Sequence, residues 1–355
     1  MRLEDFDYHL PESLIAQHPL PERTASRLMV IDRNRPDDDA IDSRATFRDL
    51  PRYLDENDVV VINRSRVIPA RLLLRRESGG EVEVLCIRRL GEFEFSAWVK
   101  PAGRLKPGEL LVAPGKPYRF QFVSRTGDRE ANLQLETGGD PGITLEKAIT
   151  EIGHVPLPPY IRRPDEPDDH GRYQTVYAEE DGSVAAPTAG LHFDRELMSE
   201  LQRAGVTIVP LVLHVGPGTF SPLDEEEVEA NTLQPEAFGM PAQTIDAVRR
   251  ARESGKRIVA VGTTVTRALE CAATMGWFET PPPKHGRVAE TDLFIYPGYE
   301  FRVVDRLITN FHLPRSSLLL LVSAFAGRER MLACYRAAVE MSYRFYSYGD
   351  AMLIR

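Results

Sequence analysis

The stretch Asp58-Val59-Val60-Val61-Ile62 decides the fold, because it is an apolar strand without a polar face. A continuous apolar run of this length is typical of a strand buried on both sides, as in a parallel sheet covered by helices. Further along the chain, helical patterns at 194–204, 244–254 and 264–273 alternate with apolar strands at 206–215 and 257–261. Such alternation predicts an α/β fold with parallel strands.

Between these two regions the pattern changes to short alternating segments separated by glycine and proline. Glu81-Val82-Glu83-Val84-Leu85 is one such segment, and it predicts an antiparallel strand with one polar face. Several of them in succession indicate a small antiparallel β-barrel. Because residues 58–62 resemble the later apolar strands, we predict that the β-barrel is inserted into a discontinuous α/β domain. The predicted domains are 1–70 with 153–355, and 71–152.

Length and composition limit the possible functions. The chain has 355 residues, above the usual size of a single core, with 42% hydrophobic and 27% charged residues. No apolar run approaches the roughly 20 residues of a membrane-spanning helix, and the N-terminus is acidic without a hydrophobic signal core. We therefore expect a cytoplasmic protein that does not enter a membrane. Its net charge of −9 argues mildly against a nonspecific grip on nucleic acid, although arginine clusters at 64–76 and 162–163 could form local basic patches.

Cysteine spacing gives no sign of a metal site or a disulfide framework. The three cysteines, Cys86, Cys271 and Cys334, lie far apart in the chain. We expect them to be ordinary core or surface residues.

Polar side chains interrupt two apolar segments near the C-terminus. In residues 307–312, a strand period of two points Asn310 and His312 to one face and Thr309 to the other. The same period in residues 344–350 groups Arg344, Tyr346, Tyr348 and Asp350. Two neighbouring strands of this kind are predicted to line a polar pocket, because buried polar groups require partners.

Loops that follow strands are the other candidate ligand sites, since backbone N–H groups and helix N-termini converge there. The first loop, 186–193, contains Thr188, Gly190 and His192, and could equally be a tight turn into a helix capped by Asp194. His192 could also be a hydrogen-bonded core histidine.

Two further loops follow apolar strands. The loop 214–220 contains Gly216 and Gly218, but Ser221 stands where a dinucleotide fingerprint requires glycine, so a simple turn is the competing interpretation. In 261–264, Thr263 and Thr264 open a helix, with Arg267 one turn later; either threonine could serve only as a helix cap.

Residues 291–299, 307–314 and 343–353, together with the loops 186–193 and 261–264, resemble the S-adenosylmethionine:tRNA ribosyltransferase-isomerase family of the queuosine pathway. The resemblance runs nearly from end to end. It implies a β/α barrel-like domain carrying an inserted antiparallel β-barrel, in agreement with the segmentation above. It also implies a reaction in which the ribosyl part of S-adenosylmethionine moves to the aminomethyl-deazaguanine (prequeuosine) wobble base of tRNA and isomerises to an epoxycyclopentane, giving epoxyqueuosine-tRNA. Adenine and methionine leave.

This chain departs from the family pattern at several positions. Asn231 and Gln234 stand where the family typically has histidine, whereas Glu236 is kept. Val265 replaces a usual serine, and Arg64 stands where Asp or Asn is common. We therefore place no catalytic role at Asn231 or Gln234.

The implied reaction requires a base beside the sulfonium and a proton donor for adenine. A neutral histidine or a carboxylate of raised pKa suits the first task. We hypothesise that His214 or His192 is the base and that Glu236 or Asp350 is the acid or the partner of the sulfonium. Thr263, Thr264 and Arg267 are the candidates for the methionine carboxylate, which arginine can bind bidentately. The other predicted substrate-binding residues are Thr188, Gly190, Gly216, Gly218, Thr219, Asn310, His312 and Tyr348.

The predicted partners are S-adenosylmethionine and a tRNA with a queuosine-type anticodon. S-adenosylmethionine is consumed as a co-substrate, and no cofactor or metal is expected; a monomer is compatible with these partners. The predicted tRNA-binding residues are Arg64, Arg66, Arg71, Arg162, Arg163 and Arg344. Two alternatives remain open, namely an S-adenosylmethionine-dependent RNA methyltransferase and a noncatalytic RNA-binding module. The methyltransferase lacks its expected glycine-rich fingerprint, and the RNA-binding module lacks an obvious row of stacking aromatics.

Overall fold

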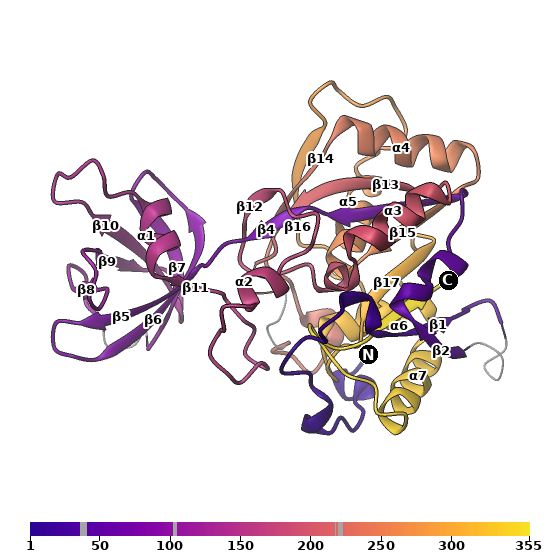
Figure 1. Cartoon of the computed structure of the whole chain (residues 1–355), viewed down its shortest axis with the longest axis horizontal. Coiled ribbons are helices and arrows are strands. Elements are labelled where there is room, and N and C mark those ends of the chain that lie inside the picture. The colour runs from indigo at the N-terminus through magenta and orange to yellow at the C-terminus, as the bar shows by residue number, and fades with distance from the viewer. Residues whose placement is uncertain (36–40, 102–104, 217, 219–222) are drawn as a thin grey trace.

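The structure is a computed structural model that describes residues 1–35, 41–101, 105–216, 218 and 223–355. Figure 1 shows two bodies joined by a narrow connection, a β-barrel on the left and a larger α/β domain on the right. Short 3₁₀ helices occur at Leu3–Phe6, Glu12–Leu14, Arg23–Ala25, Phe47–Arg52, Thr188–His192 and Val228–Ala230.

The α/β domain contains a nine-stranded mixed sheet. In spatial order its strands are β16 (Arg287–Thr291), β14 (Glu236–Met240), β13 (Thr207–Leu213), β3 (Asp58–Asn63), β15 (Arg257–Val261), β17 (Arg306–Asn310), β18 (Ala351–Ile354), β1 (Arg27–Ile31) and β2 (Ile41–Thr46). The four central strands β13, β3, β15 and β17 run parallel to one another. The outer pairs are antiparallel: β14 pairs with β13, β16 with β14, and β18 with β17. Every residue of β3 is buried, as its apolar sequence predicts.

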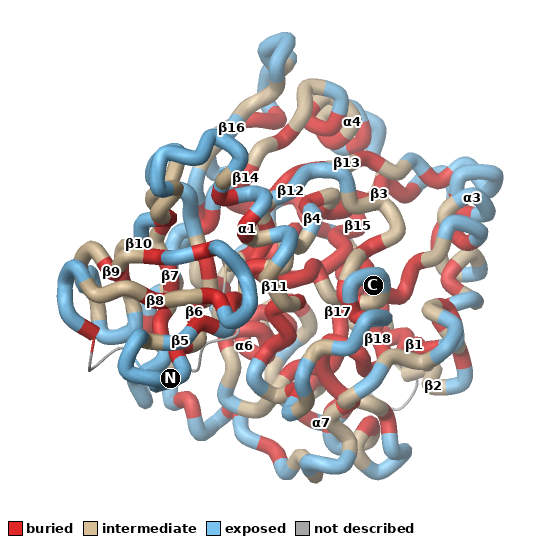
Figure 2. Tube along the Cα trace, turned by 60° about the vertical axis from the view of Figure 1, so that its left-hand side comes forward, coloured by how far each residue is buried: buried red, intermediate tan, exposed pale blue. Residues whose placement is uncertain are grey.

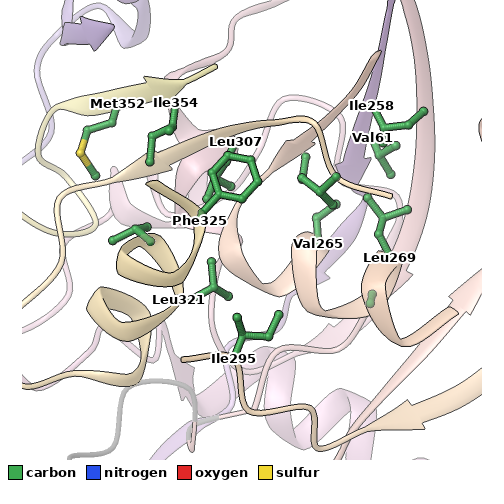
Figure 3. Close-up of a cluster of buried hydrophobic side chains, with 14 of the residues drawn as sticks. Val61, Ile258, Val265, Leu269, Ile295, Leu307, Leu321, Phe325, Met352 and Ile354 are labelled. Atoms are coloured by element: carbon green, nitrogen blue, oxygen red, sulfur yellow. The ribbon is translucent and has the colours of Figure 1, made fainter. Parts of the chain in front are cut away.

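Alternate residues of the parallel strands supply two hydrophobic cores. Val59 and Val61 pack with Ile258 and Leu307 on one face, whereas Val60 and Ile62 belong to the core on the other. Figure 3 shows the first core, where Val265 and Leu269 from α5 (Thr263–Thr274) meet Leu321 and Phe325 from α6 (Ser317–Ala326) beneath the sheet. This face is covered by α5 and α6 together with α4 (Ala242–Glu253) and α7 (Arg328–Glu340), and the other face by α3 (Arg195–Arg203).

The helices begin and end where local sequence chemistry predicts. Asp194 caps α3, because its Oδ1 accepts a hydrogen bond from the Leu197 amide at 2.8 Å, and Ser316 caps α6 in the same way. The apolar helix α6 ends before Gly327, where φ is +92°. The helices are α1 (Leu145–Ile152), α2 (Asp169–Arg172), α3 (Arg195–Arg203), α4 (Ala242–Glu253), α5 (Thr263–Thr274), α6 (Ser317–Ala326) and α7 (Arg328–Glu340).

The inserted module is a six-stranded antiparallel barrel, closed by pairing of its first strand β5 with β8. Its strands are β5 (Arg71–Arg76), β6 (Glu81–Arg89), β7 (Glu94–Lys100), β8 (Leu110–Val112), β9 (Arg119–Arg125) and β10 (Glu130–Glu136), with β11 (Gly153–His154) added beside β5. Figure 2 shows buried and exposed residues alternating along these strands, as the sequence pattern predicts. The α/β class with an inserted antiparallel barrel is thus confirmed, while the boundaries at 70/71 and 152/153 stay predictions.

Two sequence interpretations were wrong about the C-terminal segment. Residues 344–350 do not form a strand, since Tyr346 has a φ of +72° and Phe345 makes only an isolated bridge to Ile15. The strand begins at Ala351 instead. Likewise β17 ends at Asn310, so the period of two does not extend to His312, which lies against Thr309 rather than sharing a face with Asn310. Alternation applies only within an extended strand.

Candidate active site

A cavity of about 450 Å³ lies where the barrel meets the α/β domain. On the α/β side it is lined by the residues that follow β13, by the start of β14 and by helices α5 and α6. On the barrel side it is lined by Ile87, Arg88 and Arg89 at the end of β6. Since β13 is a parallel strand, the cavity lies beyond the carboxyl end of the sheet, where α/β proteins commonly bind ligands.

A buried ion pair forms one wall of this cavity. Glu236, the first residue of β14, is 6% exposed, and its Oε2 accepts a hydrogen bond from Arg267 Nη1 at 2.8 Å. The Gly216 amide donates to the other carboxylate oxygen at 3.0 Å. Arg267 also donates to the carbonyls of Leu293 and Thr291, at 2.8 and 3.3 Å. The guanidinium predicted to bind a methionine carboxylate is therefore already used to hold Glu236.

His214 lies beside this ion pair and is half-buried. Its Nδ1 is buried and has no hydrogen-bond partner among the described residues. The ring packs on Gly182, where an added Cβ would come within 2.8 Å of it. Burial lowers the pKa of His214 below its usual value, while the negative charge of Glu180 partly opposes the shift. The imidazole is thus held neutral, and its buried Nδ1 is unpartnered among the described residues.

A small polar pocket adjoins the cavity and shares Val215 and Leu318 with it. Three loops converge there, and they bring together the predicted residues Thr188, Thr263, Thr264 and His312. His312 Nε2 lies 3.0 Å from Thr309 Oγ1, and complete burial lowers the pKa of His312 to about 3. Thr263 and Thr264 open helix α5, so its first amides point toward this pocket.

His192 and Asn310 lie elsewhere, in the core. His192 Nε2 accepts from the Asn310 amide at 3.0 Å, so its Nδ1 carries the proton and donates to Ser26 Oγ at 2.9 Å. The ring stacks on Phe47, and burial lowers its pKa to about 3. Both ring nitrogens are occupied, which matches the core-histidine alternative left open for this residue.

Asp350, Tyr348 and Gly190 also have structural contacts away from the cavity. The Asp350 carboxylate accepts hydrogen bonds from the backbone amides of Arg27 and Arg344, at 2.9 and 2.8 Å. The Tyr348 hydroxyl donates to Asp169 Oδ1 at 2.8 Å. At Gly190, a Cβ would lie 2.2 Å from the Tyr177 hydroxyl oxygen, so this glycine permits close packing of the chain. Of the remaining loop glycines, Gly216 and Gly218 line the cavity, whereas Thr219 lies outside the described residues.

The six arginines predicted to bind tRNA all contact acids or carbonyls. Arg64 pairs with Glu179 and Glu180, Arg66 with Asp181, and Arg71 with Glu83. Arg162 pairs with Glu12, Arg163 with Asp169, and Arg344 donates to the carbonyl of His18. The exposed pairs among these contribute little to stability and can exchange for a phosphate, whereas Asp169, the partner of Arg163, is buried.

Sequence reasoning missed the barrel residues that line the cavity. A bulge between Cys86 and Arg88 shifts the register of β6 against β7, so that Ile87, Arg88 and Arg89 all reach the same cavity. The only signal in the sequence is the pair of arginines just before Gly91, where the strand ends. Gln234 also lines the cavity, while Asn231 is buried in a loop, where its side chain contacts Glu225 and Glu227.

Residues 3–354 match the family described as queuosine biosynthesis protein. The chain belongs to this family. Family members include proteins named S-adenosylmethionine:tRNA ribosyltransferase-isomerase from Carboxydothermus hydrogenoformans, 46% identical over 355 residues and covering all of both chains, and from Syntrophomonas wolfei, 47% identical and covering 99% of this chain and 97% of the relative. A crystal structure of S-adenosylmethionine tRNA ribosyltransferase from Thermotoga maritima is 38% identical, covers 99% of this chain and all of the other, and superposes with a TM-score of 0.55.

Two further observations concern membrane spans and metal sites. No helix in the described ranges is long and apolar enough to cross a membrane. Within the same ranges, histidine, cysteine and acidic side chains form no group of three that could hold a metal ion.

Proposed function

We propose that this chain transfers the ribosyl part of S-adenosylmethionine to the aminomethyl-deazaguanine wobble base of tRNA and isomerises it, giving epoxyqueuosine-tRNA with release of adenine and methionine. Family membership over residues 3–354 supports this reaction, as do the names of relatives that match the full chain. The observation in the structure that carries it is the cavity between the domains, which holds a neutral histidine beside a carboxylate fixed by arginine. S-adenosylmethionine is consumed as a co-substrate, without a cofactor, and the reaction on tRNA takes place in the cytoplasm.

His214 is the base in this proposal and Glu236 the charged partner of the sulfonium. His214 fits because its ring is neutral, lines the cavity and has an unpartnered nitrogen. Removing a proton from the ribose carbon beside the sulfonium is a task for such a group, and general base catalysis typically gives about 10²–10⁴-fold acceleration. Glu236 faces the same space, with its position fixed by Arg267 and Gly216. Their geometry favours these two residues over His192 and Asp350, whose polar atoms are used in the core.

For the methionine carboxylate we propose the small pocket at the start of α5. The helix has 12 residues, and its N-terminal amides together with the hydroxyls of Thr263 and Thr264 suit a carboxylate. Thr188 and His312 also line this pocket. For tRNA, the surface arginines at the domain junction exchange their carboxylate partners for phosphates.

Product analysis tests the reaction directly. The protein is incubated with S-adenosylmethionine and tRNA carrying the aminomethyl-deazaguanine base, and the small molecules are separated by chromatography. Adenine and methionine are expected. S-adenosylhomocysteine would identify a methyltransferase instead, and binding of tRNA without consumption of S-adenosylmethionine would identify a noncatalytic RNA-binding module.

The role of His214 is tested by substitution. His214→Gln is expected to lower kcat by about 10²–10⁴-fold while tRNA affinity is retained. His170→Gln is the control, because His170 is exposed on α2 and lines neither the cavity nor the small pocket. Unchanged turnover in His214→Gln would remove His214 from the mechanism.

A further inference from the structure

A second hollow, a groove of about 660 Å³, continues from the cavity past His214. The two share His214, Ala237 and Glu290, so together they form one path along the ends of β13, β14 and β16. Apart from His214 and Arg64, the residues that line this groove have no role in the proposals above. Its composition is therefore informative about what else the site binds.

Five arginines line the cavity and the groove, and they fall into two groups. Three of them are engaged: Arg267 by Glu236, Arg64 by Glu179 and Glu180, and Arg89 by Glu146. The other two, Arg88 and Arg287, make no ion pair or side-chain hydrogen bond within the described part of the chain. They lie at opposite ends of the path, Arg88 in the cavity and Arg287 in the groove.

Arg287 is held in a position that requires an acceptor. It lies on the edge strand β16, its guanidinium carbon is 5.9 Å from the centre of the Trp277 ring, and its Nε is buried without a partner. A buried donor that makes no hydrogen bond is costly, and an anion in the groove could reach the part of this guanidinium that lines it. The next residue, Val288, also lines the groove and is 84% exposed, which leaves an apolar surface for a flat ring beside the cation.

Arg88 is the corresponding cation on the barrel. It is exposed at the end of β6, and the bulge before it turns it into the cavity. Its neighbour Arg89 is tied to Glu146 and to the carbonyls of Gly91 and Glu92. Of the two arginines at the end of β6, only Arg88 is therefore available to bind a ligand.

Acidic side chains line the path between Arg88 and Arg287. Glu180 is neutralised by Arg64 at 2.6 Å, whereas Glu290 lies in the wall shared by cavity and groove. A phosphate would be repelled by Glu290 but could bind at either end, and a base could donate hydrogen bonds to Glu290 in the middle.

We propose that a single RNA strand follows this path, with the modified nucleotide in the cavity between two flanking phosphates, one bound by Arg88 and the other by Arg287. A neighbouring base lies against Val288 in the groove. This inference rests on the proposed function, since it describes how the tRNA substrate presents its wobble base. Arg88 lies in the barrel and Arg287 in the α/β domain, so the RNA strand contacts both domains.

The first test measures tRNA affinity as a function of salt concentration for Arg88→Met and Arg287→Met. Methionine keeps an apolar stem of similar length, against Trp277 in the second case. Each variant is expected to bind about tenfold more weakly near 0.1 M salt and to lower the salt slope by about 0.7, the value for one single-strand phosphate contact. The matched controls are Arg119→Met in the barrel and Arg252→Met on α4, both exposed and outside the cavity and groove.

S-adenosylmethionine affinity is measured in parallel and is expected to stay within about twofold of the starting protein. If Arg88→Met lost affinity for S-adenosylmethionine instead of tRNA, Arg88 would be a ligand of the methionine carboxylate and the proposal would be overturned. Far-UV circular dichroism reports whether each variant folds. Arg287→Lys keeps the charge and is expected to retain the salt slope even if Arg287→Met is unstable.

The second test identifies the phosphates by a double-mutant cycle. Anticodon stem-loops are prepared with a neutral methylphosphonate on the 5′ or the 3′ side of the wobble nucleotide. Each arginine variant is expected to become insensitive to one of these replacements and to remain sensitive to the other, because the pair that interacts is non-additive. If the losses of affinity were additive for every combination of arginine variant and methylphosphonate, the proposed path of the RNA strand would be overturned.

The proposal and the proposed function can fail separately. A protein that releases no adenine from S-adenosylmethionine and tRNA overturns the function. A protein that does release adenine, but whose Arg88 and Arg287 variants bind tRNA like the Arg119 and Arg252 controls, overturns only the path of the RNA strand.

Discussion

Arg267→Met should destabilise the fold chiefly by leaving the Glu236 carboxylate without its counter-charge. The two side chains are 4% and 6% exposed and are joined by a hydrogen bond of 2.8 Å. Removing one partner of a buried ion pair typically costs about 3–5 kcal/mol, because the remaining charge is desolvated and uncompensated. Within this total, the two carbonyls to which the same guanidinium donates account for roughly 1 kcal/mol each. We expect the free energy of unfolding of Arg267→Met to fall by about 3–5 kcal/mol.

The double variant separates the charge from the carbonyl contacts. Glu236→Gln removes the unpaired charge, and its side-chain oxygen can still accept from the Gly216 amide. We therefore expect Glu236→Gln/Arg267→Met to recover roughly 2 kcal/mol relative to Arg267→Met, with the remaining loss due to the carbonyls of Leu293 and Thr291. Unfolding in urea, followed by tryptophan fluorescence with unchanged m-values, measures these differences.

The opposite result would refute this reasoning. If the losses of the two single variants simply add, the guanidinium does not hold Glu236 and is available for a ligand, as the sequence suggested. In that case Arg267→Met should mainly raise the Michaelis constant for S-adenosylmethionine. If Arg267 instead positions Glu236, the variant that still folds should mainly lose kcat.

Three further outcomes follow from groups near the site and in the core. Glu180→Gln removes the charge that raises the pKa of His214, so the acidic limb of the kcat/KM profile should move to lower pH, and an unmoved limb would exclude His214 as its source. The pKa of His192 is lowered from 6.5 to about 3, so its contribution to stability is complete above pH 6.5 and is lost as the pH falls toward 3. Urea titrations should show a loss of roughly 2 kcal/mol from this group between pH 6.5 and 5, which is absent in a folded His192→Gln variant. Gly190→Ala should cost about 1–3 kcal/mol, since its Cβ would lie 2.2 Å from the Tyr177 hydroxyl, and a fully stable variant would show that the loop repacks freely.

The sequence predicts the fold well where periodicity is local. The apolar run of β3 and the alternating strands of the barrel each carry their own pattern, and both predictions are confirmed. The order of strands in the large sheet is different, because β18 and β1 pair across more than 300 residues of chain. Such pairing depends on contacts that no local pattern records.

The site shows the same division. Loops after parallel strands were expected to converge, and Thr188, Thr263 and His312 do line one pocket beside His214. The strand period failed for residues 344–350, where Tyr346 has a positive φ that no polar–apolar pattern indicates. The bulge that turns Arg88 toward the cavity is equally invisible, since a single extra residue changes the direction of every side chain after it.

The way the barrel is attached has a mechanical consequence. Its first strand begins at Arg71, and the strand that closes the insertion ends at His154; these two residues pair directly. The chain therefore enters and leaves the barrel through two adjacent, paired strands, so any hinge between the two domains would lie at this pair. A rotation of the barrel about this pair of strands would change the distance between Arg88 and His214, which line the same cavity from the two domains.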